Sequence, residues 1–129
     1  MKKEQIEANP ILKLTFDFSL DIMEYCDHLD ELRKYTISRQ LLKSGTSIGA
    51  NSMEAQNAES KADFIHKMKI AIKEADETEY WLLLCKHSKE YPNTDYLIEK
   101  LTSITKILNK IIGTSKKQNT NSSANHLIS

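Results

Sequence analysis

The chain has 129 residues, and its 18 Lys and Arg balance its 18 Asp and Glu, so the formal net charge is zero. This length suits one domain with a single modest core. Three Gly and two Pro are too few to punctuate an all-β chain. Zero net charge argues against a protein that binds polyanions over its whole surface, but it is compatible with a local basic patch.

The sequence contains neither an export signal nor a membrane-spanning segment. Residues 1–10 are polar and lack the apolar centre of a signal peptide. The longest apolar run, residues 80–85, is far shorter than the roughly 20 residues that span a bilayer. Cys26 and Cys85 form no CxxC pair. We therefore expect a cytoplasmic protein with buried, reduced thiols and no membrane partner.

The first helix is expected to begin at Pro10, because Asn9 suits the N-cap and proline suits the first helical position. Apolar residues then recur at steps of three and four from Ile11 through Leu14 to Leu29, which is typical of one buried helix face.

A second helix is expected over residues 38–56, with an inward stripe of mostly small residues. Gly45 and Gly49 lie one turn apart on it, and each interior glycine costs about 1 kcal/mol relative to alanine. Close approach of another helix backbone requires such small residues, so we expect a tight helix contact here.

Ser60 and Asp63 form a capping-box pattern that predicts the start of a third helix. Its apolar residues keep a 4-3-4-3 spacing as far as Cys85, as in a coiled-coil seam. A fourth helix follows the turn at residues 91–94 and is expected to end at Gly113. The sequence thus predicts an all-α, antiparallel up-down four-helix bundle over residues 1–113. Residues 114–129 are polar and predict a disordered tail.

No motif for catalysis is present. The glycines form no phosphate-binding loop, and the four histidines belong to no recognisable triad. A bundle core can hold a metal through inward Glu-x-x-His pairs, but the nearest match is Asp63 with His66, and His66 points away from the seam. We expect no catalytic residue, metal, cofactor or small-molecule substrate.

Charge is segregated along the chain. Residues 17–31 contain six acids and no Lys or Arg, whereas residues 100–117 contain five Lys and no acid. In an antiparallel bundle these segments lie toward opposite ends. That polarity suits head-to-tail association into a ring, or a basic end that touches phosphates, or a plain solvated surface. The lysines that we expect to contact nucleic acid are Lys43, Lys106, Lys110, Lys116 and Lys117.

A second group of residues combines a polar strip with small and aromatic neighbours. Polar side chains in a bundle need partners when they are desolvated, and a contact between subunits would supply them. Tyr80 and Trp81 could stack on bases, but their position beside a buried seam favours core or subunit packing. The residues predicted for this interface or polar motif are Gln40, Gly45, Ser47, Ile48, Gly49, Asn51, Glu54, Glu77, Tyr80 and Trp81.

At these residues the sequence resembles the four-helix bundle proteins named for the intervening sequences of 23S ribosomal RNA genes. The pattern of that family, Gln-x-x-Arg-x-x-x-Ser-Ile-x-x-Asn-x-x-Glu, reads here as Gln40, Lys43, Ser47, Ile48, Asn51 and Glu54. A helix with Phe-Ile and later Ala and Glu follows, here Ser60, Phe64, Ile65, Ala71 and Glu77. Lys43 stands where arginine is usual, and Ala55 stands where many members have glycine.

The resemblance implies four-helix protomers that assemble into ring-shaped homopentamers without enzymatic activity. The related accessory variability proteins of diversity-generating retroelements bind nucleic acid and a reverse transcriptase, and they are typically more basic than this chain. The leading hypothesis is a non-enzymatic, ring-forming bundle that engages RNA, DNA or a nucleic-acid-bound protein through its basic end. A pure protein-interaction scaffold is the alternative, and a metal-dependent enzyme in the bundle core is a third.

Overall fold

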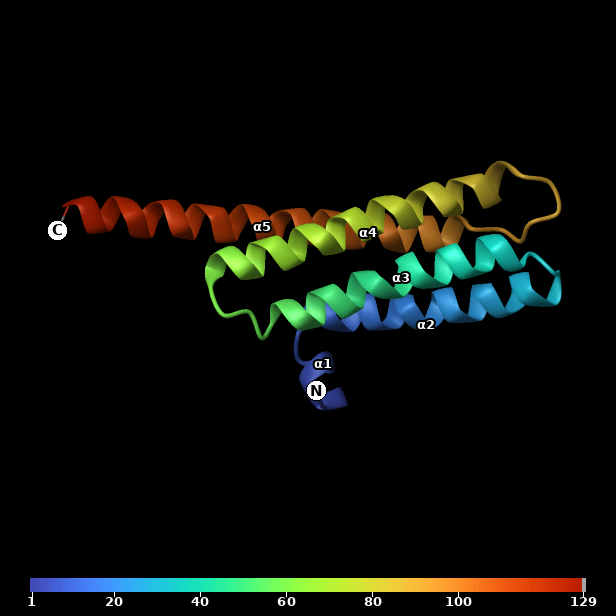
Figure 1. The fold of residues 1–129 in the computed structure, drawn as a ribbon, viewed down its shortest axis with the longest axis horizontal. Coiled ribbons are helices and arrows are strands. Elements are labelled where there is room, and N and C mark those ends of the chain that lie inside the picture. The colour runs from blue at the N-terminus through green and yellow to red at the C-terminus, as the bar shows by residue number, and fades with distance from the viewer. Residues whose placement is uncertain (129) are drawn as a thin grey trace.

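The computed structural model describes the backbone of residues 1–128 and the side chains of residues 1–118. Five helices follow one another along the chain: α1 (Lys3–Glu7), α2 (Pro10–Glu31), α3 (Tyr35–Ala55), α4 (Lys61–His87) and α5 (Asp95–Ile128). The four long helices pack antiparallel, so the predicted all-α four-helix bundle is confirmed (Figure 1).

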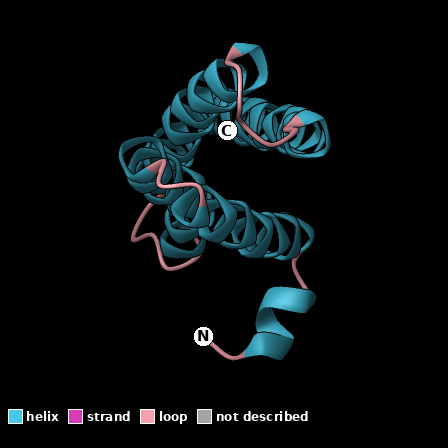
Figure 2. Cartoon of the chain, turned by 90° about the vertical axis from the view of Figure 1, so that its right-hand side faces the viewer, coloured by secondary structure: helices cyan, strands magenta, loops and turns pink. Residues whose placement is uncertain are grey.

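The four long helices pack side by side in chain order and close into a ring. Helix α3 contacts α2 on one side and α4 on the other, and α5 contacts both α4 and α2. In the part of the chain that the structure describes, the backbones of α3 and α5 do not come close, so these helices lie diagonally across the bundle. Figure 2 shows the long helices from one end, joined by short loops, with the short α1 to one side.

Two of the expected helix starts are confirmed by their caps. The side chain of Asn9 accepts hydrogen bonds from the backbone N–H groups of Ile11 and Leu12, at 3.2 and 3.4 Å. The Ser60 hydroxyl accepts one from the backbone N–H of Asp63 at 3.0 Å. Each bond satisfies a donor that the first helical turn would leave unpaired.

Other boundaries differ from the sequence-based expectation. Helix α3 begins at Tyr35, three residues before the expected start, and α1 was not expected at all. Helix α1 contributes one buried side chain, Ile6, which is too little periodicity to mark a helix in a sequence.

The apolar stripes expected from the spacing meet in one core. Helix α2 contributes Phe18, Ile22 and Leu29, all almost fully buried, whereas Leu14 was expected to face inward and is 38% exposed. The other fully buried large side chains come from the remaining long helices: Leu41, Ile48, Met68, Leu82, Leu97, Leu101, Ile104 and Leu108.

Both cysteines are free and buried, as expected. Burial raises the pKa of Cys26 to about 11, although a hydrogen bond with Ser38 partly opposes this shift. Burial also raises the pKa of Cys85. Thiols held in the protonated form are poor nucleophiles, so these residues act as small core side chains.

The glycines of α3 allow the expected close contact, and α2 is the helix that approaches. A Cβ atom built on Gly45 would lie 2.9 Å from two side-chain carbons of Ile22. At Gly49 it would lie 3.3 Å from the side chain of Thr15. The two helices can therefore approach this closely only because these positions lack a side chain.

The fourth long helix does not end where the sequence suggests. Helix α5 continues through Gly113 to Ile128, so Gly113 is an exposed interior residue and not a C-cap. Residues 114–118 belong to this helix, and Ser115 is buried, so the boundary expected at residue 113 lies too early. Side chains from residue 119 onward lie outside those described, as does all of Ser129, and the expected disorder of that end stays a prediction.

We predict opposite effects for the same substitution at two glycines. Gly45→Ala should lower the free energy of unfolding by about 1–3 kcal/mol, because the new methyl group would overlap the buried Ile22. Gly113→Ala should raise it by about 0.5–1 kcal/mol, because a Cβ there meets nothing within 4 Å and alanine favours helix. Urea denaturation of both variants measures the two changes, and a stabilising Gly45→Ala would contradict the close α2–α3 contact.

Candidate nucleic-acid interface

The expected lysines of α5 form one outward-facing row. Lys110 and Lys117 follow Lys106 by four and eleven residues, so at 100° per residue the three lie within about 40° of one another. All three are exposed, and the buried Leu108 lies roughly 200° around the helix from Lys106 and from Lys110. The row therefore points directly away from the core. Lys116, beside it, is exposed too.

The start of α4 adds four lysines to this end of the molecule. Residues 61–73 carry Lys61, Lys67, Lys69 and Lys73. Because α4 and α5 are antiparallel, this segment lies beside the part of α5 that leads up to residue 118, and the Lys61 ammonium donates a hydrogen bond to the Gln118 side chain at 3.0 Å. We call these side chains the basic face: Lys61, Lys67, Lys69, Lys73, Lys106, Lys110, Lys116 and Lys117.

Acidic side chains are nearly absent from the segments that form the basic face. Asp63 is the sole acid in residues 61–73 and 100–118, and its carboxylate lies 3.9 Å from the Lys67 ammonium. The α4 lysines were not predicted as part of this site, because they do not form a long run of one charge: Asp63 lies among them and acids follow from residue 74. The signal available was the switch at residue 74, where four acids follow within six residues.

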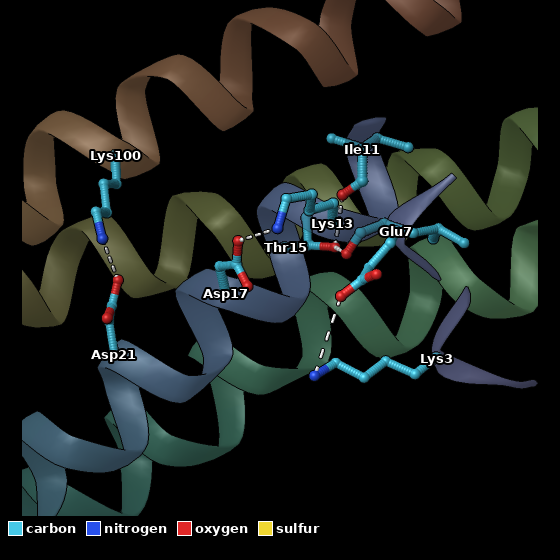
Figure 3. Close-up of polar contacts among 9 residues, drawn as sticks. Lys3, Glu7, Ile11, Lys13, Thr15, Asp17, Asp21 and Lys100 are labelled. Atoms are coloured by element: carbon cyan, nitrogen blue, oxygen red, sulfur yellow. Dashed lines mark hydrogen bonds and ion pairs between the residues drawn. The ribbon is translucent and has the colours of Figure 1, made fainter. Parts of the chain in front are cut away.

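The opposite end of the bundle is acidic, as the charge pattern predicts. There the six acids of residues 17–31 occupy the part of α2 that runs to its C-terminal end, and the cluster of acids on α4 begins at the middle of that helix, in residues 74–79 (Figure 1). A hollow of about 470 Å³ between α2 and the α4–α5 connector is lined by Glu24, Asp27 and Glu31. One lysine of α5, Lys100, belongs to this end and pairs with Asp21 of α2 (Figure 3).

Lys43 does not join the basic face. It lies on α3, whose backbone does not come close to that of α5 in the described part of the chain, and its charge acts on Glu74 of α4. Burial raises the pKa of the Glu74 carboxyl, the neighbouring Glu77 raises it further, and Lys43 partly opposes both.

Two side chains of the polar strip on α3, Ser47 and Asn51, find hydrogen-bond acceptors within their own helix. The Ser47 hydroxyl donates to the Lys43 carbonyl at 2.6 Å, and the Asn51 side chain donates to the Ser47 carbonyl at 2.8 Å. These two half-buried groups thus find acceptors in their own helix and need no second subunit. Gln40 and Glu54 are exposed on the same helix, as is Glu77 on α4.

The remaining predicted interface residues divide between core and surface. Gly45 and Ile48 are buried within the protomer, and half-buried Gly49 packs against α2. Tyr80 is 57% exposed and makes an edge-to-face contact with Trp81, with ring centroids 5.2 Å apart. Trp81 packs against the core, and its indole nitrogen is the one buried side-chain donor without a partner among the described residues.

Neither a metal centre nor a membrane span emerges from the described residues. No three His, Cys, Asp or Glu side chains among them are grouped as metal ligands. His66 is exposed. Within the same part of the chain, no helix has the length and apolar character to cross a bilayer.

Comparison with known proteins assigns the chain to a family. The family model described as 23S rRNA-intervening sequence protein matches residues 7–110, which is most of the chain. The chain belongs to this family. A crystal structure of a protein with unknown function from the S23 ribosomal protein family of Bacteroides thetaiotaomicron is also similar, with 40% sequence identity and a TM-score of 0.76. That alignment covers 79% of this chain and 97% of the other, and no curated protein matches.

The family match places the basic face partly outside the common segment. Lys61, Lys69 and Lys106 lie within residues 7–110 of this 23S rRNA-intervening sequence protein, whereas Lys116 and Lys117 follow it. The continuation of α5 past residue 110 therefore extends the lysine row beyond the part that the family model describes.

We predict a pH-dependent effect for Glu74→Gln. A carboxyl whose pKa is raised in the folded state opposes folding when it is ionised, so its removal should stabilise the protein at neutral pH. The gain should stay below about 1 kcal/mol, because the side chain is only partly buried. It should shrink as the pH falls through the raised pKa, where Glu74 becomes neutral.

Thermal melts of wild type and Glu74→Gln at neutral and acid pH measure this difference. The exposed Glu4→Gln on α1 is the control and should leave both melting temperatures unchanged. A lower melting temperature for Glu74→Gln at neutral pH would mean that Lys43 holds Glu74 in a stabilising ion pair.

Proposed function

We propose that this protein is a non-enzymatic helical bundle that binds RNA through its basic face. One observation carries the proposal: eight lysines and a single acid occupy the adjoining segments of α4 and α5 in a chain whose net charge is zero. Such a concentration at one end is not required by folding, because these lysines are exposed or half-buried and lie outside the core.

The distribution of charge would also orient the protein as it approaches RNA. Phosphates are attracted to the basic face and repelled by the acidic end formed by α2 and residues 74–79. Lysine binds phosphate as a point charge on a flexible stem, so affinity would come from released counterions and not from precise geometry.

The proposal predicts that Lys106→Glu/Lys110→Glu abolishes RNA binding. Fluorescence anisotropy with a structured RNA at two salt concentrations measures the affinity. Wild type should bind in the micromolar range or tighter at low salt and lose about tenfold or more as salt rises from 50 to 200 mM, since a tenfold loss corresponds to about two phosphate contacts.

The matched control is Arg39→Glu/Lys89→Glu, which changes the net charge by the same amount. Arg39 and Lys89 are exposed and lie outside the basic face, so this variant should bind RNA within about twofold of wild type. Equal losses in both double variants would show that net charge, and not the basic face, governs binding. Absence of binding by wild type at low salt would overturn the proposal.

A protein-interaction scaffold is the second candidate, and exposed apolar side chains favour it. On α2 and α3, the side chains of Leu20, Met23, Tyr35 and Leu42 are each between 39% and 50% exposed. Exposed apolar patches commonly mark protein contacts. The ring of identical chains implied by the resemblance belongs to this candidate, and it is compatible with RNA binding at the basic end.

The scaffold candidate predicts that Leu20→Lys/Met23→Lys lowers the native mass. Two charges in an apolar contact between copies would lose their hydration on assembly, which should separate the subunits. Light scattering coupled to size exclusion measures the mass, and circular dichroism checks that the variant keeps its helix. A multimeric wild type whose mass is unchanged in the variant would place the contact elsewhere.

A further inference from the structure

We infer that the basic face recognises double-helical nucleic acid through its phosphates, without reading bases. This inference rests on the proposed function and specifies its ligand. It follows from three features of the basic face: which side chains it lacks, how its lysines are spaced, and where the exposed aromatic residues lie.

The basic face has no Phe, Tyr or Trp side chain on which a base could stack, and its exposed ring in residues 61–73 is the small imidazole of His66. The chain has nine aromatic residues, and none of them falls between residues 97 and 129. Among Phe, Tyr and Trp, residues 61–73 contain only Phe64, which packs against the core. Proteins that bind single strands rely on aromatic stacking for about 1–3 kcal/mol per base, and this source of affinity is missing here.

The exposed Tyr80 and its half-buried neighbour Trp81 lie in acidic surroundings instead. Tyr80 and Trp81 follow Asp76, Glu77 and Glu79 on α4, where ionised carboxylates repel a phosphate backbone. A strand held by the basic face would have to cross this acidic segment to reach Tyr80. The pair is therefore not part of the same binding surface.

The lysines form two rows on neighbouring helices. On α5, Lys106 and Lys117 are eleven residues apart, which is about 16 Å along the helix axis. On α4, Lys69 and Lys73 lie one turn apart, and packed helix axes are separated by about 8–10 Å. Two rows on adjoining helices can contact more than one line of phosphates, as a duplex presents, whereas an extended single strand presents one line.

The energetics favour the duplex over the single strand. A duplex carries one charge per about 1.7 Å, and its binding releases about 0.9 counterions per phosphate contact, against about 0.7 for a single strand. A duplex is also already ordered, whereas a flexible strand loses conformational entropy when lysines fix it. The basic face has no exposed Phe, Tyr or Trp whose stacking would offset that loss.

The test compares ligands of matched charge on wild-type protein at low salt. One is a mixed-sequence RNA duplex of roughly 20 base pairs, about two helical turns. The second is a DNA duplex of the same length and sequence, and the third is an oligouridylate with as many phosphates as the duplex. We expect the RNA duplex to bind about tenfold more tightly than oligouridylate, and shuffling its sequence to change affinity by less than about twofold.

Two variants separate the modes of binding. Lys106→Gln/Lys110→Gln should weaken binding to both duplexes and reduce the slope of log K against log salt by about two. Tyr80→Ala, outside the basic face, should leave affinity for every ligand unchanged. A loss of oligouridylate binding in Tyr80→Ala would show that stacking contributes and would overturn the inference.

The outcomes also separate this inference from the proposed function. Tighter binding to oligouridylate than to the duplexes, or a tenfold change on shuffling, overturns the inference while RNA binding itself stands. Failure of all three ligands to bind overturns both.

Discussion

The close contact between α2 and α3 is the constraint on which the bundle depends. Gly45 leaves room for Ile22, and Gly49 does the same for Thr15, so α3 can lie tightly against α2. On its other side α3 is tied to α4 by a buried hydrogen bond of 2.9 Å from the Thr78 hydroxyl to Ser44. With α3 held from both sides by small residues, the larger side chains of the core fill the space between α2, α4 and α5.

This arrangement leaves the outward faces of α4 and α5 free to carry charge. The core takes its apolar side chains from one stripe of each helix, so the opposite stripe contributes little to stability. In α4 that freedom produces a switch from lysines to acids at residue 74, and in α5 it produces a row of lysines without acids as far as residue 118. The two changes coincide in space because the helices are antiparallel, and a neutral chain thereby becomes a strongly polar molecule.

Much of the fold can be predicted from the sequence, because buried apolar residues recur at the three- and four-residue spacing of a helix face. The stripes from Phe18 to Leu108 and the caps at Asn9 and Ser60 were predictable from spacing and residue type. The passage of α5 through Gly113 was not, since a glycine that would suit a helix end is also tolerated inside one at modest cost. For the site, the α5 lysines were predicted, whereas the α4 lysines became neighbours only through tertiary packing. Lys43 was assigned to them from sequence alone, and it lies on the helix diagonal to α5.

Because α5 is one continuous helix, the angle between its buried apolar stripe and its outward lysine row is fixed. Residues 97–112 supply core side chains, and the outward lysines are on the same uninterrupted helix, so the angle between apolar and charged stripes is set by residue count alone. A single-residue insertion between Leu108 and Lys117 would turn the distal lysine by about 100° relative to the core, with no change in composition. In this part of α5, insertions and deletions should therefore disturb the lysine row more than substitutions do. A substitution changes one surface side chain, whereas an insertion or deletion rotates every residue that follows it relative to the core.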